Sequence, residues 1–174
     1  MIETADSKHK KKYRQVFKNN MQKKEEPVIE SQTGEDYTCI TFYPDLKRFN
    51  MERMDRDIVA LMTKRAYDMA GTSDSKVRIF LNGERINCKN FEDYCDMYLK
   101  IDENKDLPKI VEKKQERWEI IASLSDGQFQ QVSFVNSICT SKGGTHVNYI
   151  TDQIVSKIHA AIQKKNKKMD IKPH

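Results

Sequence analysis

The spacing of apolar residues changes near residue 50, and this change constrains the fold more than any other feature of the chain. Before it, apolar residues alternate with polar ones, most clearly over residues 37–43. Beyond it, Met54, Ile58 and Leu61 recur at helical spacing. A period of two is typical of strands, and a period near 3.6 is typical of helices. We therefore predict a strand-rich part over residues 1–49 and a mixed part over residues 50–174.

The second part is predicted to contain three helices and two hairpins. Asn50 is expected to cap the first helix, and the other two are expected over residues 91–99 and after Thr145. Asn82-Gly83 predicts a tight hairpin, because these residue types tolerate the positive φ angles of such a turn. A longer hairpin is predicted over residues 118–138, with its turn at Asp126-Gly127.

These elements predict an α+β fold, an α/β two-layer sandwich with helices on one face of a sheet. A sheet covered in this way buries the apolar stripes of both layers. The core of residues 50–174 is expected around Trp118, Phe134, Ile150 and Ile154.

Composition excludes several classes of protein. The longest apolar runs have only four or five residues, which excludes a membrane span, and the Lys-rich start is unlike a signal peptide. The four cysteines form no C-x-x-C pair and no Cys/His cluster with zinc spacing, so we predict no metal site. Their pattern favours reduced thiols in the cytosol or nucleus.

No catalytic constellation is predicted. The four histidines are scattered, and neither a nucleophile-elbow motif nor a P-loop motif is present. Residues 141–145 form a glycine-containing turn before a helix, which would suit phosphate but lacks the P-loop spacing. We favour a structural role for this turn, because glycine permits the unusual backbone angles of a strand-to-helix connection.

Positive charge is concentrated at both ends of the chain. Residues 1–26 carry eight Lys and Arg against four Asp and Glu, and residues 157–174 carry six against one. In the predicted last helix, Lys157, Lys164, Lys165 and Lys168 fall on one stripe. Two interpretations remain open at this point. The lysines either stabilise and solvate a helix C-terminus, or they contact nucleic-acid phosphates without reading sequence.

Several motifs resemble the eukaryotic type II DNA topoisomerases. They occur in the order of that family and span most of the chain: DYTCITF at 36–42, DIVALM at 57–62, RAYD at 65–68, FLNG at 80–83, QQVSFVNSI at 130–138 and TSKGGTHV at 140–147. The resemblance implies that residues 1–49 are the last strands of a gyrase/Hsp90-type ATPase domain. It implies that residues 50–174 are a transducer domain, incomplete at its C-terminus, with a left-handed βαβ crossover.

The resemblance also implies a function. Family members are nuclear homodimers that use ATP and Mg²⁺ to pass one DNA duplex through a break in another. The family's residues that contact nucleotide and cleave DNA have no counterpart in this sequence, so the fragment alone is expected to bind no cofactor and to be inactive. Its expected role is to relay nucleotide state and to line the DNA cavity.

The family's basic DNA-contacting segment aligns with the end of the predicted last helix. The expected DNA-binding residues are therefore Gln163, Lys164, Lys165 and Lys167. The alternative is a stand-alone, non-enzymatic basic adaptor that binds nucleic acid.

Overall fold

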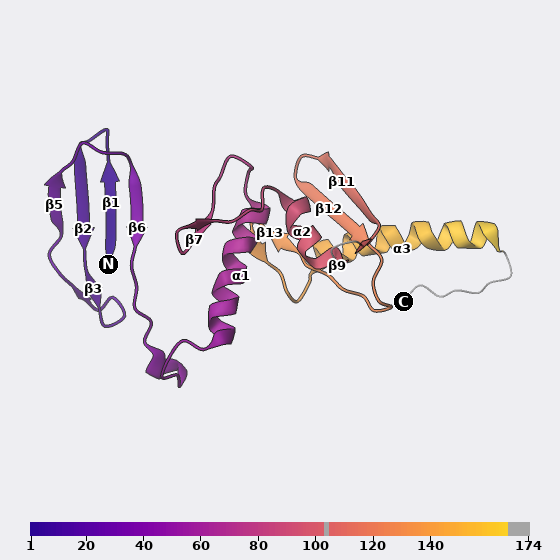
Figure 1. Ribbon diagram of the computed structural model, residues 1–174, viewed down its shortest axis with the longest axis horizontal. Coiled ribbons are helices and arrows are strands. Elements are labelled where there is room, and N and C mark those ends of the chain that lie inside the picture. Colours follow the sequence, from indigo (N-terminus) through magenta and orange to yellow (C-terminus); the bar gives the residue numbers. More distant parts are fainter. Residues whose placement is uncertain (103–104, 167–174) are drawn as a thin grey trace. The chain divides into compact units, whose positions relative to one another are not determined.

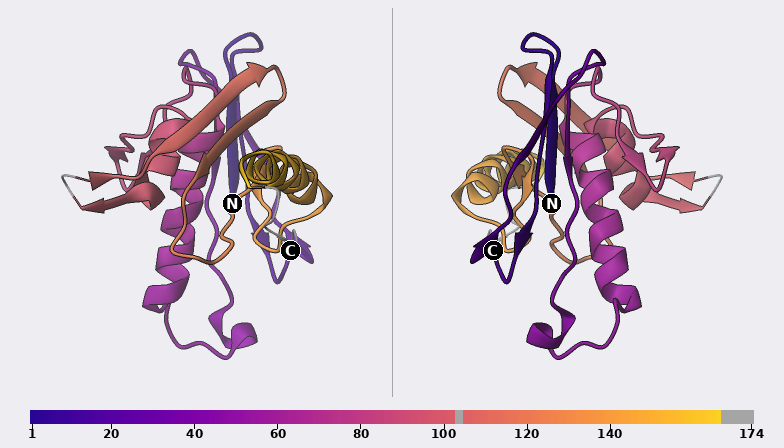
Figure 2. Two further views of the ribbon diagram at one scale, coloured as in Figure 1. Left: turned by 90° about the vertical axis from the view of Figure 1, so that its right-hand side faces the viewer. Right: turned by 90° about the vertical axis from the view of Figure 1, so that its left-hand side faces the viewer.

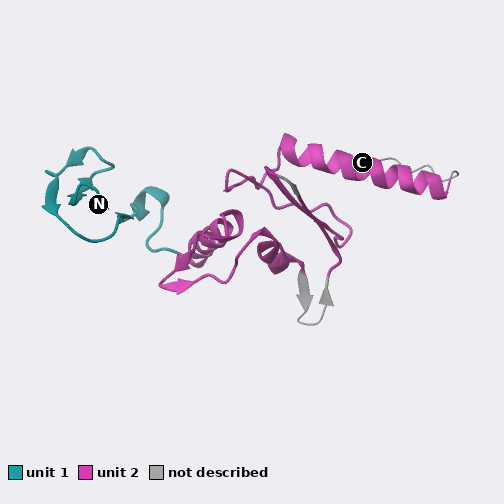
Figure 3. Ribbon diagram, turned by 90° about the horizontal axis from the view of Figure 1, so that it is seen from above, with its two compact units in different colours: residues 1–54 teal, residues 55–174 magenta. Residues whose placement is uncertain are grey.

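The computed structural model describes residues 1–102 and 105–166, which form two compact units. Unit 1 comprises residues Met1–Met54 and unit 2 comprises Asp55–His174 (Figure 3). The strand-rich part and the mixed part predicted from the sequence correspond broadly to these units. Their assignment to an ATPase domain and a transducer domain stays a prediction.

Unit 1 is a four-stranded antiparallel sheet in the order β5-β2-β1-β6 (Figure 1). The strands are β1 (Ile2–Asp6), β2 (Lys11–Gln15), β5 (Val28–Ser31) and β6 (Tyr37–Ile40), and a separate small hairpin pairs β3 (Phe17–Lys18) with β4 (Lys23–Lys24). Among the described residues of this unit only Ala5 is buried. The sheet therefore leaves most of its apolar side chains exposed, including Ile40 at 68%, and Phe42, just after β6, is 66% exposed.

Unit 2 combines three helices with short antiparallel hairpins. The helices are α1 (Arg56–Thr72), α2 (Phe91–Leu99) and α3 (Thr145–Lys165). The strands are β7 (Phe80–Leu81), β8 (Glu84–Arg85), β9 (Lys100–Asp102), β10 (Lys105–Asp106), β11 (Lys109–Gln115), β12 (Trp118–Ser123), β13 (Phe134–Val135) and β14 (Ile138–Cys139). The hairpin of β11 and β12 lies between α2 and α3 (Figures 2 and 3).

The predicted α+β class is confirmed, because antiparallel sheets and three helices are both present. The strand pairs of the described residues are all antiparallel, and those of unit 2 form separate two-stranded sheets. The left-handed crossover, which needs parallel strands, and the single sheet covered by helices on one face therefore stay predictions.

The predicted start of the first helix was wrong by five residues. Asp55 caps α1, and its side chain accepts a hydrogen bond from the Ile58 amide at 2.9 Å. Asn50 instead follows a 3-10 helix, Leu46–Phe49, and adopts a left-handed conformation with φ of 54°. Asn is suited to both positions, because its short polar side chain tolerates the left-handed region and also caps helices.

The predicted long hairpin over residues 118–138 was also wrong. β12 pairs with β11, the strand before it in the sequence, from Lys109↔Ser123 to Gln115↔Trp118. β13 pairs with β14 instead of with β12. The turn between β13 and β14 holds Asn136 and Ser137 at φ of 50° and 62°, as a tight hairpin requires. The Asn82-Gly83 hairpin of β7 and β8 was predicted correctly.

The core of unit 2 is centred on Tyr94 of α2, which is 1% exposed. Ala70 of α1, together with Ile86 and Cys88, completes the buried cluster, and Phe134 packs against it. The prediction also placed Trp118, Ile150 and Ile154 in the core, but α3 has no buried residue and Ile154 is 37% exposed. Trp118 is 39% exposed and contacts the Tyr149 ring of α3 at 6.2 Å between centroids.

Gly71 lets α1 and α2 approach each other. A Cβ at this position would lie 2.5 Å from Tyr94 Cβ and 2.7 Å from Tyr94 Cγ. These atoms belong to the root of a buried side chain, which cannot move without displacing α2. Glycine lowers the intrinsic stability of α1, but its lack of a Cβ allows α2 to pack closely against the helix.

We expect Gly71→Ala to lower the free energy of unfolding by about 1–3 kcal/mol through overpacking. Helix propensity alone would instead raise the free energy of unfolding by about 1 kcal/mol. The sign of the measured change therefore distinguishes overpacking from helix propensity. Urea unfolding of the 174-residue chain measures the change. Ala60→Gly, at an exposed position of the same helix, gives the size of the propensity effect. A Gly71→Ala chain more stable than the wild type would contradict the packing account.

Candidate nucleic-acid interface

The candidate interface lies at the end of α3, the long helix that begins after Gly143-Gly144. Gly144 has φ of 153° and is the residue before the first turn. The helix ends where the Asn166 amide donates to the Ile162 carbonyl at 2.8 Å. Lys164 and Lys165 occupy the last turn, where free carbonyl groups make positive charge favourable.

Three of the four predicted DNA-binding residues lie together on that turn. Gln163, Lys164 and Lys165 are all exposed, whereas Lys167 lies outside the described residues. The Gln163 amide donates to His159 Nε2 at 3.3 Å, one turn earlier. Lys157 is also exposed, and it shares a face with Lys164, because seven residues return to within about 20° on a straight helix.

Lys164 and Lys165 have no carboxylate partner among the described residues. Three other lysines of unit 2, Lys64, Lys109 and Lys113, are paired with carboxylates. Lys64 Nζ lies 2.8 Å from Asp68 Oδ1, and Lys113 Nζ lies 3.2 Å from Glu92 Oε2. Among the described residues, the end of α3 therefore carries two cations whose charge no carboxylate offsets.

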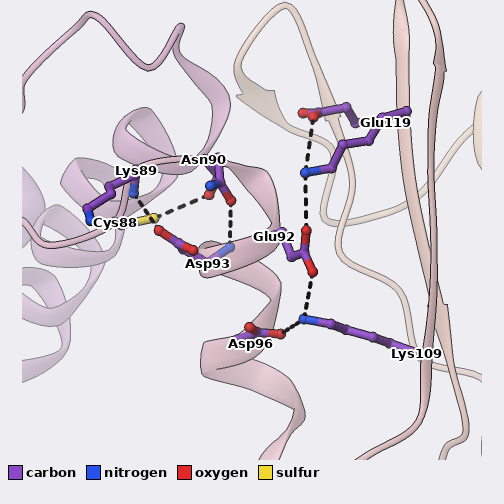
Figure 4. Close-up of polar contacts among 9 residues, drawn as sticks. Cys88, Lys89, Asn90, Glu92, Asp93, Asp96, Lys109 and Glu119 are labelled. Carbon is purple, nitrogen blue, oxygen red and sulfur yellow. Dashed lines mark hydrogen bonds and ion pairs between the residues drawn. The ribbon is translucent and has the colours of Figure 1, made fainter.

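Lys109 and Lys113 of β11 form a network of ion pairs with α2, which sequence reasoning missed (Figure 4). Lys109 Nζ contacts Glu92 Oε1 at 3.1 Å and also contacts Asp96, and Lys113 extends the network to Glu119. The hydrogen bond from Lys109, followed by that from Lys113, lowers the pKa of Glu92. Hydrogen bonds to Asp96 and Glu92 raise the pKa of Lys109.

The start of α2 is fixed by a reciprocal cap that orients this network. The Asp93 amide donates to Asn90 Oδ1 at 2.9 Å, and the Lys89 amide donates to Asp93 Oδ2 at 2.9 Å (Figure 4). Glu92 and Asp96 are four residues apart and so share a face of α2. That spacing was visible in the sequence, but the partner strand could not be identified without the correct hairpin.

No metal site was found in the part of the chain that the structure describes. No cluster of three or more His, Cys, Asp or Glu side chains there is arranged to hold a metal ion. In the glycine turn, the Gly143 amide donates to the Thr140 carbonyl at 2.8 Å, which supports the structural interpretation. The four cysteines are free thiols, and burial raises the pKa of Cys95 to about 12. No described helix is both long enough and apolar enough for a bilayer.

Comparison with known proteins identifies close relatives across the whole chain. DNA topoisomerase 2 of Arabidopsis thaliana is 54% identical over 100% of this chain, and DNA topoisomerase 2-alpha of Homo sapiens is 50% identical over 95%. The chain spans only 12% and 11% of these two relatives. A family model described as DNA gyrase B matches residues 90–173.

Solved structures show the same fold. The ATPase region of Saccharomyces cerevisiae topoisomerase II matches with a TM-score of 0.86 and 44% identity, covering 94% of this chain and 42% of that one. The ATPase and transducer domains of the Balamuthia mandrillaris enzyme match with a TM-score of 0.85 and 37% identity, over 95% of this chain and 42% of theirs. The fold is thus that of a type II topoisomerase ATPase region. The chain belongs to the eukaryotic DNA topoisomerase 2 family.

We expect the link between α2 and β11 to weaken in acid. Because the pKa of Glu92 is lowered in the folded chain, its contribution is present above the unfolded pKa and is lost as pH falls through the folded pKa. Glu92→Gln should therefore reduce the loss of stability between about pH 5 and pH 3, measured as the urea midpoint.

Glu84→Gln, at an exposed position on β8, is the matched control and should keep the wild-type pH dependence. If both variants change the pH dependence equally, Glu92 has no special role in the link.

Proposed function

We propose that this chain is the part of a type II DNA topoisomerase that joins its ATPase site to its DNA-passing machinery. Residues 1–49 are the last strands of the ATPase domain, and residues 50–174 are an incomplete transducer. The 54% sequence identity to a DNA topoisomerase 2 over the whole chain supports this assignment. The structural match to a topoisomerase II ATPase region supports it as well. The role is mechanical, because the chain contributes no catalytic group and by itself does not turn over ATP.

In the full-length enzyme, ATP and Mg²⁺ bind in the part of the ATPase domain that this chain lacks. The enzyme acts on duplex DNA in the nucleus as a homodimer, and dimer contacts lie in those missing parts. Unit 2 relays the nucleotide state and lines the cavity through which the duplex passes. The exposed apolar residues of unit 1, such as Ile40 and Phe42, are covered by the rest of the ATPase domain.

The DNA assignment rests on the place of Lys164 and Lys165, where the resemblance puts the family's DNA-contacting segment, and on their lack of a carboxylate partner among the described residues. Cations already neutralised by carboxylates, such as Lys109, gain little from a phosphate, because the carboxylate must first be displaced. Unpaired exposed cations attract the DNA backbone without that cost, and the counterions they displace make binding depend on salt. Contacts of this kind set affinity and position but carry no base information. Gln163 and Lys167 complete the proposed contact segment.

The stand-alone adaptor would use the same lysines, so the DNA assignment does not depend on the choice between the two. Relatives at about half identity over the whole chain favour the topoisomerase. An isolated adaptor would need no sequence kinship with an ATPase region.

We expect Lys164→Ala with Lys165→Ala to weaken duplex binding uniformly across DNA sequences. Each phosphate contact contributes about −0.9 to the slope of log affinity against log salt, so this slope should become shallower by about two units. Fluorescence anisotropy with duplexes of different sequence measures the slope. Stability should change by about 1 kcal/mol or less, because lysines near a helix end act mainly through the dipole.

Lys23 and Lys24 on β4 provide the matched control, because they are adjacent, exposed and without an ion pair among the described residues. Their double replacement by Ala should leave the salt slope unchanged. If it lowers the slope as much as the Lys164 and Lys165 change does, binding is diffuse charge attraction and the site is wrongly assigned.

A further inference from the structure

A chain of polar side chains connects the β13–β14 hairpin to the first turn of α3. His146 Nε2 lies 3.1 Å from Thr140 Oγ1, which in turn contacts Ser133 Oγ. Ser133 Oγ lies 2.8 Å from Gln131 Oε1. Neither the ion pairs nor the proposed DNA contacts use these residues.

The orientation of the Gln131 amide is fixed by its backbone neighbours. Gln131 Nε2 lies 3.1 Å from the Ser141 carbonyl oxygen and 3.5 Å from the Thr140 carbonyl oxygen. Carbonyl oxygens only accept hydrogen bonds, so the donor end of the amide must face them. Its acceptor end, Oε1, therefore faces Ser133.

Counting hydrogens then fixes the direction of the whole chain. Two oxygen atoms that only accept face Ser133 Oγ, namely Gln131 Oε1 at 2.8 Å and the Thr140 carbonyl at 3.3 Å, so its single hydroxyl hydrogen goes to the nearer one, Gln131 Oε1. Thr140 must then donate to Ser133, which leaves Thr140 Oγ1 to accept from His146 Nε2. In the reverse direction, two oxygen atoms 2.8 Å apart would face each other with no hydrogen between them.

We infer that His146 carries its proton on Nε2 and is a positioning residue that fixes the start of α3 on the β13–β14 hairpin. Gly144 makes this placement possible, because a Cβ there would lie 3.0 Å from both Cε1 and Nδ1 of the ring. The role of His146 in the enzyme rests on the proposed function, because α3, the helix that His146 positions, carries the lysines proposed to contact DNA.

The same hairpin is held by α1 at its turn. Arg65 Nη1 donates to the Ser137 carbonyl at 2.7 Å, and Ser137 Oγ donates to the Thr72 carbonyl at 3.3 Å. Lys64 Nζ lies 5.9 Å from the centre of the Phe134 ring. The hairpin is thus fastened to α1 at its turn and to α3 through His146, which makes it a physical link between the two helices.

The protonation state of His146 tests the inference in the wild-type chain. Nitrogen-15 NMR at pH 8, above the usual histidine pKa, distinguishes the two neutral tautomers. We expect Nε2–H for His146, its signals being assigned by their loss in His146→Gln. His9 is an internal reference, because its Nδ1 faces Asp6 Oδ2 at 2.6 Å and should carry the proton instead. An Nδ1–H tautomer at His146 would overturn the inference.

Variants test the anchoring role separately from DNA binding. His146→Gln keeps an N–H donor at the same number of bonds from Cβ, whereas His146→Asn places it one bond short. Thr140→Val removes the hydroxyl group at nearly constant shape. We expect exchange of the Asn148 amide, in the first turn of α3, to accelerate about tenfold in the Asn and Val variants and to stay near wild type in the Gln variant.

Equal acceleration in His146→Gln and His146→Asn would show that the ring acts by size alone, which contradicts the inference. Both measurements are made without DNA. Their failure would leave the salt slope assigned to Lys164 and Lys165 untouched, and failure of that slope would leave the tautomer result standing.

Discussion

The buried carboxylate of Asp68 is the interaction on which the rest of unit 2 depends. It lies on α1, is 3% exposed and accepts a hydrogen bond from Tyr94 Oη at 2.6 Å. Lys64 Nζ contacts both of its oxygen atoms, at 2.8 and 3.0 Å. Without α2, Asp68 would keep Lys64 of its own helix but lose the hydrogen bond from Tyr94, and losing a buried hydrogen bond costs about 1–3 kcal/mol, so this bond favours α2 remaining on α1. Tyr94 remains a neutral donor, since burial raises the pKa of its hydroxyl.

The other contacts of unit 2 follow from this junction. With α2 held on α1, the exposed side of α2 presents Glu92 and Asp96 to Lys109 and so places the β11–β12 hairpin. The buried side offers the Tyr94 ring to Phe134, at 5.6 Å between centroids, and so places β13. The β13–β14 hairpin then contacts α3, whose far end carries Lys164 and Lys165. Each element of unit 2 is thus held in place by its contacts with the element described before it.

Sequence reasoning succeeded where the signal was local. The Asn82-Gly83 hairpin, the helix over residues 91–99 and the basic end of the long helix depend on neighbouring residues alone, and the structure contains all three. The family was recognised from motifs whose order and spacing few unrelated chains would share, and the relatives confirm it.

Sequence reasoning failed where contacts between residues distant in sequence determine the structure. The apolar alternation of Trp118–Ser123 is compatible with pairing to the preceding strand or to the following one. Asp126-Gly127 is typical of a tight turn and so favoured the following strand, whereas β12 pairs with the preceding strand β11. The importance of Gly71, Asp68 and Tyr94 was invisible because each residue is ordinary by itself. The hydrogen-bond chain ending at His146 likewise exists only because a strand, a turn and a helix meet there.

Native-state hydrogen exchange on Tyr94→Phe tests most directly whether the Asp68 junction holds unit 2 together. Loss of the hydroxyl leaves the buried carboxylate under-satisfied, which should accelerate exchange about tenfold or more. The account predicts that the protected amides of α1 and α2 accelerate together, while those of β1 and β2 in unit 1 do not change. Acceleration confined to α2, with α1 as protected as in the wild type, would contradict it.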